Sequence, residues 1–212
     1  MHFDVPFGPV IGKVSLPEDE FKTVLALVED LRAQKEKKLA GMGLAGEIEK
    51  EWQIDKVLLE KYGLSKMLEE CVEKYANQMN NRYYRQILMP QNENDNKLVT
   101  KSAWLNVMKR YEYNPIHYHT GCKLSCILYV KTPDLMKSNV SLKPDSIRKN
   151  KDHRPDGRVE FIYGSSVKGS GNRATCRYRP KAGDLYIFPS FLLHTVYPFD
   201  NEEERISIAA NF

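Results

Sequence analysis

The sequence is poor in cysteine and has no long apolar run. Its 212 residues include four cysteines, and no second closely spaced pair accompanies Cys122 and Cys126, as a zinc knuckle would require. No stretch of about 18 consecutive apolar residues occurs, so we predict no transmembrane helix and no membrane partner. The opening segment MHFDVPFGPV lacks the pattern of a secretory signal peptide. These absences predict a cytoplasmic protein whose cysteines are reduced and structural.

Charge of one sign gathers in only one part of the chain. The net charge is +4, but twelve Lys and Arg stand against four Asp and Glu between Lys137 and Lys181, a local charge of +8. Residues 134–157, rich in Lys, Asn, Asp and Pro, predict a long basic loop insertion. No nucleic-acid-binding motif accompanies this charge, so a nucleic-acid partner is not expected. We interpret the loop as solvated, with a lid over a substrate as the alternative.

Helical patterns dominate residues 1–97 after a short opening strand. Apolar residues recur at helical spacing in two stretches, and these faces are expected to pack on a core. Ser15 and Glu18, which have the spacing of a capping box, predict the start of the first helix. The second helix is predicted to begin near Ser65. The polar stretch PQNENDNK then ends this region.

The pattern changes to strands in residues 98–212. Short β-branched and aromatic segments alternate there with Gly, Pro, Asn and Asp. The segments are SAWLNVMKRYEY, KLSCILYV, GRVEFIYG, ATCRYRP, GDLYIFPS and RISIAANF. The fold class is therefore mainly β with flanking α, in a single domain 1–212. Residues 98–212 are expected to form its β core, a sandwich or barrel, and the N-terminal helices are expected to buttress it.

Three histidines have the positions expected of metal ligands. His117 and His119 lie one residue apart, and residues i and i+2 of a strand point to the same side. Both imidazoles are thus predicted to face one point, with Tyr118 facing away. His194 also lies beside a strand pattern, although an isolated histidine in such surroundings is usually a packed core residue. Together the three predict a metal site, because neutral imidazole is the commonest metal ligand.

These segments resemble those of a known enzyme family. HYH, LSCILYV, GDLYIFPSFLLHTVYPF and RISIAANF are similar to segments of the iron(II)/2-oxoglutarate-dependent oxygenases, particularly the prolyl-hydroxylase-like group and small oxygenases of bacteria and phages. The resemblance covers residues 102–212. It implies a double-stranded β-helix, a jelly roll of two facing antiparallel sheets. It also implies hydroxylation of a substrate with Fe(II), 2-oxoglutarate and O2, and release of succinate and CO2.

The resemblance also implies roles for individual residues. His117, His119 and His194 match the metal ligands, and Arg205, eleven residues after His194, matches the arginine that binds the far carboxylate of 2-oxoglutarate. From local sequence alone, Arg205 could equally pair with a neighbouring glutamate on the surface. Three further residues are predicted to contact the cosubstrate: Tyr129, Ser207 and Asn106.

One position departs from the family pattern. The second ligand of the family is normally Asp or Glu, and this chain has His119. Three neutral imidazoles would leave a divalent iron with a formal charge of +2 instead of +1. Such a set does not exclude iron, since carboxylate is only the preferred hard ligand. Glu112 and Asp134 are alternative carboxylates, but neither has the right spacing.

Two other classes of protein remain open. Cupins share the barrel and often use three histidines, and Gly183, Asp184, Pro189 and His194 resemble the second cupin motif. The first cupin motif requires a glutamate shortly after the histidine pair, and this chain has none there. A cupin-like metalloprotein without 2-oxoglutarate and a non-catalytic binding module are therefore alternatives. The substrate stays open between a prolyl residue of a protein and a small molecule.

Overall fold

The computed structural model describes residues 1–4, 8–41, 44–79, 98–134, 156–164 and 174–212. The predicted basic loop 134–157 and the predicted boundary near residue 97 lie almost wholly outside these ranges. In chain order the elements are β1 (His2–Asp4), β2 (Ile11–Ser15), α1 (Glu18–Ala33), β3 (Lys50–Gln53), α2 (Lys56–Lys61), α3 (Leu64–Gln78), β4 (Ser102–Met108), β5 (Asn114–His117), β6 (Leu124–Lys131), β7 (Val159–Ile162), β8 (Thr175–Tyr178), β9 (Asp184–Pro189), β10 (Leu193–Val196) and β11 (Arg205–Asn211).

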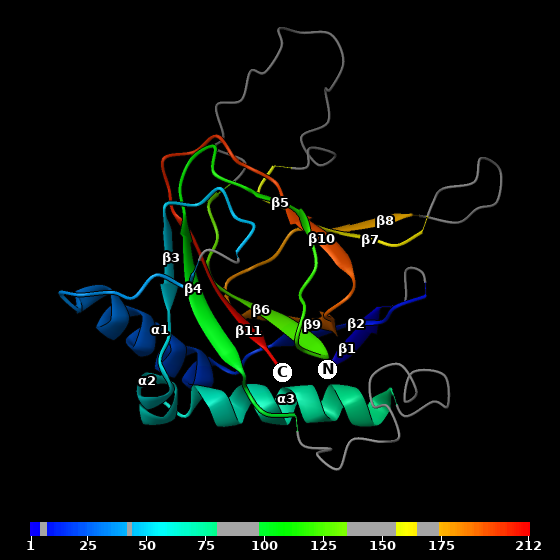
Figure 1. The fold of residues 1–212 in the computed structure, drawn as a ribbon, viewed down its shortest axis with the longest axis horizontal. Helices are drawn as coiled ribbons and strands as arrows, with labels where there is room; N and C mark the ends of the chain where they lie inside the picture. Colours follow the sequence, from blue (N-terminus) through cyan, green and yellow to red (C-terminus); the bar gives the residue numbers. More distant parts are fainter. Residues whose placement is uncertain (5–7, 42–43, 80–97, 135–155, 165–173) are drawn as a thin grey trace, which may run out of the picture.

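Two antiparallel sheets form the core of the fold (Figure 1). The major sheet has the order β1-β2-β9-β6-β11-β4-β3, and the minor sheet has the order β5-β10-β7-β8. Buried aromatic and aliphatic side chains fill the space between them, among them Tyr129, Phe161, Tyr186 and Phe188. The predicted fold class, a mainly β double-stranded β-helix with flanking helices, is confirmed.

The helices cover the other face of the major sheet. Both longer helices are amphipathic, and each buries one apolar stripe, as the spacing in the sequence predicts. The buried residues are Val24, Leu27, Val28 and Leu31 of α1, and Leu64, Leu68, Val72 and Tyr75 of α3. In Figure 1, α3 runs along the bottom of the view, beneath the strands of the major sheet. None of the described helices is long and apolar enough to span a membrane.

The strands of the major sheet present alternate side chains to its two faces. Along β11, Ile206, Ile208 and Ala210 join the cluster that packs on the helices. Arg205 and Ser207, which alternate with them, line a pocket between the two sheets. The period of two in a β-strand therefore separates the structural face from the polar face.

The N-terminal region differs from its sequence prediction in several respects, and the short helix α2 was not predicted. The region contributes β2 and β3 as well as an opening strand, and the short β3 was not predicted. Ser15 does not cap α1 but ends β2, where its hydroxyl donates to Asp184 at 3.1 Å. Pro17 precedes the helix instead, without a capping side chain. Long-range pairing of β2 with β9 has overridden the local capping signal.

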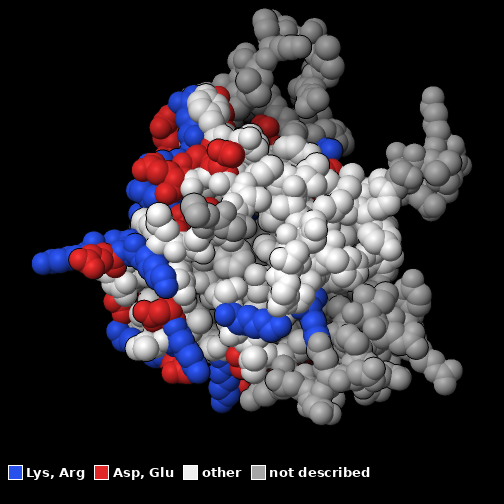
Figure 2. Space-filling view, viewed as in Figure 1, with Lys and Arg blue, Asp and Glu red and all other residues white. Residues whose placement is uncertain are grey.

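Charged side chains are unevenly spread over the face in Figure 2. They gather over α1, α2 and the turns beside β3 and β4, on the left of the view. The surface over β5 and β10 is largely uncharged. Ile116 of β5 and Leu193 of β10 are exposed apolar residues of these two strands.

Candidate active site

Two of the three histidines come from paired strands of the minor sheet. His117 ends β5 and is the direct partner of His194 on β10. Residues paired in this way place their side chains on the same face, and the two ring centroids are 4.1 Å apart. The inward face of the minor sheet thus carries two adjacent imidazoles.

The third histidine lies just beyond the strand. We predicted His119 on the same strand as His117, but β5 ends at His117. The backbone N–H of His119 donates to the carbonyl of Ser190 at 2.9 Å, which holds the chain beside the minor sheet. The His119 ring lies 5.2 Å from that of His117 and 5.1 Å from that of His194. Tyr118 is exposed, as predicted.

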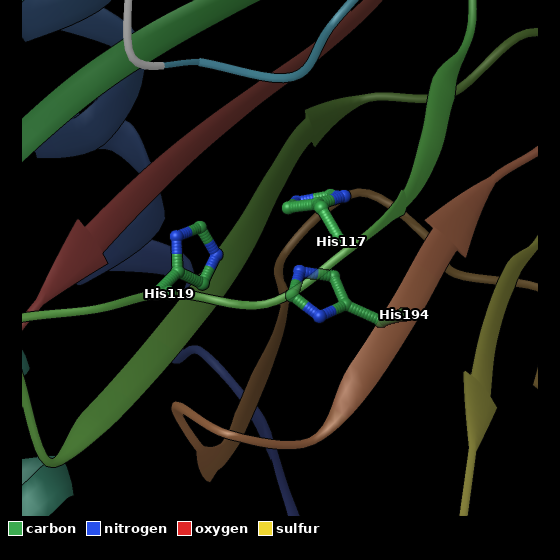
Figure 3. Close-up of side chains that lie close together, drawn as sticks. All are labelled: His117, His119 and His194. Atoms are coloured by element: carbon green, nitrogen blue, oxygen red, sulfur yellow. The ribbon is translucent and has the colours of Figure 1, made fainter.

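The three imidazoles surround one point (Figure 3). Each offers one ring nitrogen, and these atoms all lie within 4.8 Å of one another. Nδ1 of His117 lies 2.7 Å from the carbonyl of Pro115, and Nδ1 of His194 lies 2.9 Å from that of Leu192. A carbonyl can only accept, so Nδ1 carries the proton and Nε2 keeps its lone pair. This tautomer is the one that a metal ligand requires.

Burial keeps the three rings neutral. Desolvation lowers the pKa of His119 to about 4, with a further contribution from His117. Desolvation likewise lowers the pKa of His117, and it lowers that of the nearly inaccessible His194 well below its usual value. Neutral imidazole is the form that binds a metal, so the donor set fits a divalent cation without first losing protons.

Neither alternative carboxylate takes part in this group. Among the described residues, the three histidines alone have metal-ligand spacing. The carboxylate of Glu112 accepts hydrogen bonds from the backbone N–H groups of Glu49 and Lys109, at 3.1 and 2.7 Å. It is therefore engaged in the turn after β4. Asp134 lies beyond the end of β6, outside this group.

The histidines open into a narrow pocket between the sheets, and part of this pocket is open to solvent. The major sheet supplies its polar side opposite the histidines, through β4 and β11. The lining residues are Ile48, Trp104, Asn106, Met108, Asn114, His117, His119, Ile127, His194, Val196, Arg205, Ser207 and Ala209. Ile48, Trp104 and Asn114 were not predicted as site residues, since an isolated apolar or amide residue gives no signal of its own.

Arg205 is a buried cation in this pocket. Its side chain is 3% exposed, so the surface ion pair considered from the sequence does not form. One terminal nitrogen donates to the Tyr129 hydroxyl at 2.8 Å, and the other lies 3.3 Å from the Met108 sulfur. Nε has no partner, and no carboxylate among the described residues pairs with the guanidinium. A buried charge without a counterion is costly, so the pocket is suited to an anion.

The other predicted residues lie on the same wall. Ser207 and Asn106 are direct partners on β11 and β4, and both line the pocket. Tyr129 pairs with Ser207 from β6 and is fully buried. Burial raises the pKa of the Tyr129 hydroxyl, so it stays protonated. The structure thus brings all seven predicted residues to one cavity or to its immediate border.

Comparisons with known proteins agree with this geometry. The family described as "Putative 2OG-Fe(II) oxygenase" matches residues 102–211. No curated protein matches the sequence.

The fold is similar to that of several solved oxygenase structures. A prolyl-4-hydroxylase of Pseudomonas putida has a TM-score of 0.56 at 14% identity, over 95% of this chain and 91% of its own. A prolyl hydroxylase of Trichoplax adhaerens, in complex with a peptide of hypoxia-inducible factor, has a TM-score of 0.56 at 13% identity, over 95% and 83%. The epimerase SnoN of nogalamycin biosynthesis has a TM-score of 0.55 at 16% identity, over 94% and 76%. At these identities the structures support the fold alone.

The family match extends over more than half of the chain and includes every predicted site residue. Fe(II), 2-oxoglutarate and O2 are the cofactor and cosubstrates that this family implies. The chain therefore belongs to the Fe(II)/2-oxoglutarate-dependent oxygenases, a family of oxidoreductases.

Proposed function

We propose that this protein hydroxylates a substrate at an unactivated C–H bond and converts 2-oxoglutarate to succinate and CO2. His117, His119 and His194 would hold the iron, and Arg205 would hold the cosubstrate. When bound, the iron supplies the oxidising chemistry, which amino-acid side chains cannot perform. The protein's own contribution is to bind, orient and shield.

The observation that carries the proposal is the uncompensated guanidinium of Arg205. It lies in the same pocket as the three histidines, 3% exposed, with Nε unpaired. A guanidinium fork matches a carboxylate in geometry and stays charged at any working pH. The Tyr129 hydroxyl accepts a hydrogen bond from Arg205, so its own hydrogen remains available to donate to the carboxylate that Arg205 would bind. A dicarboxylic cosubstrate explains why a cation and a metal-binding group share one pocket.

The remaining polar groups of the wall would orient the cosubstrate. Ser207 offers a hydroxyl donor on the same face of β11 as Arg205. The amide of Asn106 offers a donor from the adjacent strand. Aromatic residues of the inter-sheet cluster exclude water around the histidines, with Phe188 4.8 Å and Phe161 6.0 Å from the His194 ring. Such a dry surrounding strengthens the attraction between the fixed charges and an anionic cosubstrate.

The three-histidine set is also compatible with an anionic cosubstrate. Three neutral imidazoles would leave a bound divalent metal with its formal charge of +2, which would favour the anionic oxygens of 2-oxoglutarate. The lowered pKa values of the three rings make this set available at neutral pH. His119 is therefore proposed as a true ligand.

The test measures succinate from 2-oxoglutarate with the purified protein, Fe(II) and O2. We expect the wild-type protein to form succinate, and Arg205→Ala to lose this activity while it still binds one equivalent of metal. Metal binding is read separately, from the spectrum of the Co(II)-loaded protein. The control is Arg32→Ala, because Arg32 makes only an exposed ion pair with Glu204.

The same measurement separates the alternatives. If the protein is cupin-like, the wild-type protein and Arg205→Ala would both bind metal, and neither would form succinate. A non-catalytic module would bind no stoichiometric metal. Either result would contradict the proposal. The bound peptide of the Trichoplax adhaerens relative supports a polypeptide as one candidate class of substrate, beside a small molecule.

A further inference from the structure

One carboxylate beside the pocket stands apart from the other partly buried carboxylates. Glu51 lies on β3, and it is the direct partner of Asn106 on β4. Partners in an antiparallel pair have Cβ atoms about 4.5–5.5 Å apart on the same face. Asn106 lines the pocket, so the side chain of Glu51 borders the same space on the side toward the sheet edge.

Glu51 lies at the edges of the two sheets, where the sheets are not joined to each other by strand pairing. β3 is the last strand of the major sheet, and β5 is the last strand of the minor sheet. Gly46 lies between these edges. A Cβ atom added at Gly46 would lie 2.6 Å from Oε1 of Glu51 and 2.7 Å from Oδ1 of Asn114, a pocket-lining residue of β5. The carboxylate of Glu51 and the amide of Asn114 therefore both border the position of Gly46.

Several other buried or half-buried carboxylates of the described residues have donors. Glu160 pairs with Arg177 at 2.8 Å, and Asp184 pairs with Lys13 at 2.8 Å. Glu112 accepts two backbone N–H bonds. Glu51 is half-buried, yet its carboxylate makes no hydrogen bond or ion pair within the part of the chain that the structure describes. Desolvation, and then repulsion from Glu112, raises the pKa of Glu51 to about 7.

An adjacent atom also lacks a donor. Asn106 is 7% exposed, and its Oδ1 has no hydrogen-bond partner. At neutral pH, 2-oxoglutarate carries only acceptor oxygens, so the cosubstrate cannot satisfy this atom. The Asn106 amide can donate to the cosubstrate through Nδ2, while Oδ1 still needs a donor from another molecule. Two neighbouring acceptors, Asn106 Oδ1 and the Glu51 carboxylate, thus remain after the cosubstrate is accounted for.

We propose that Glu51 is a substrate-recognition residue, which binds a protonated nitrogen of the substrate at the open edge between β3 and β5. This inference rests on the proposed function. The ligand class is an amine or guanidinium, as in a lysine or arginine side chain or a free amino compound. Its positive charge would pair with Glu51, and one of its N–H groups would reach Oδ1 of Asn106. A cation there would also relieve the repulsion between Glu51 and Glu112.

The experiment compares matched pairs of probes that differ in charge and little in shape. The pairs are L-arginine with L-citrulline and L-lysine with Nε-acetyl-L-lysine, each also placed in a blocked tripeptide. Binding to the protein loaded with Mn(II) and 2-oxoglutarate, without O2, is measured by calorimetry. The variants are Glu51→Gln, which removes the charge, and Gly46→Ala, which keeps the carboxylate but displaces it. Glu60→Gln, on the exposed side of α2, is the control.

We expect the wild-type protein and the Glu60→Gln control to bind the cationic member of at least one pair about 10-fold more tightly than the neutral member. Glu51→Gln should reduce this ratio to about one, and Gly46→Ala should give an intermediate ratio. The inference is overturned if no pair shows a charge preference in the wild-type protein, or if the preference survives in Glu51→Gln. Failure of the proposed function is a separate result, seen as no succinate from the wild-type protein with O2 and Fe(II).

Discussion

The two faces of the major sheet are made by the same strands and serve different purposes. On the helix side, β4 presents Ala103, Leu105 and Val107, all within an apolar cluster. On the pocket side, the same strand presents Trp104 and Asn106. The helix side is mostly aliphatic and has no buried polar atom without a partner among the described residues. The pocket side holds two such atoms, on Asn106 and Arg205.

The pocket side of the major sheet is therefore less favourable for stability than the helix side. Apolar burial stabilises a fold by about 25 cal/mol for each Å² removed from water, and the helix side supplies much of it. An unsatisfied buried polar atom costs about 1–3 kcal/mol, and the pocket side carries that cost. Such sites are typical of function, because a ligand can satisfy what the protein leaves open. Substitutions on the two sides should therefore have separable effects.

The largest effect is expected at His194, on the minor sheet facing this pocket. His194→Ala removes one of the three proposed ligands, and we expect Co(II) affinity to fall by more than about 100-fold. The stabilisation by added metal should disappear with it, because a ligand stabilises only the state that binds it. The rise in melting temperature with Co(II) checks this. His2→Ala, on the exposed strand β1, should keep the full rise, and a rise retained in His194→Ala would contradict the assignment.

Two adjacent residues of β11 compare the faces directly. Ile208 is fully buried on the helix side, and Ile208→Ala should lower the free energy of unfolding by about 2–5 kcal/mol. Ser207 is 5% exposed on the pocket side, and Ser207→Ala should lower it by less than about 1 kcal/mol. Urea unfolding measures both. The Michaelis constant for 2-oxoglutarate should rise for Ser207→Ala alone, and equal losses of stability would contradict the division between the faces.

Two buried tyrosines give a smaller version of the same comparison. Tyr75 of α3 donates to the carbonyl of Val10 at 2.8 Å, and the Tyr129 hydroxyl accepts from Arg205 at 2.8 Å. Each change to phenylalanine removes one hydroxyl and should cost about 1 kcal/mol of stability. Tyr129→Phe should also raise the Michaelis constant for 2-oxoglutarate about 10-fold, and Tyr75→Phe should leave it unchanged. Steady-state kinetics that show no difference would remove Tyr129 from the cosubstrate site.

The smallest effect is a pH-dependent change of stability at Glu51. Its pKa is about 7 in the folded protein and near 4.5 without burial, so folding favours the protonated form. That contribution is fully present below pH 4.5 and is lost as the pH rises through 7. Glu51→Gln should therefore be more stable than the wild-type protein by about 1 kcal/mol at pH 8, allowing for solvent screening, and about equal to it near pH 4.5. Urea unfolding at both pH values measures this, and a constant difference would contradict the raised pKa.

Local sequence patterns were sufficient for the elements with strong periodicity. The apolar spacing that marked α1 and α3 is set by the helix period, and the β-branched segments after residue 98 became strands of the two sheets. Weak or short elements were missed. β3 has only four residues and a charged sequence, and pairing with β4 forms it. Ser15 carried a capping signal, but the longer-range pairing of its strand prevailed.

The sequence by itself identified the candidate ligands and predicted which residues of a strand share a face. Imidazoles two residues apart and an arginine among alternating apolar residues are local facts of composition and period. Only the tertiary structure decided that His194 pairs with His117 across two strands, that Arg205 is buried without a counterion, and that Glu51 borders Asn106. These relations join residues far apart in the chain, and their electrostatic consequences depend on burial. Burial arises only when the two sheets close over the same space.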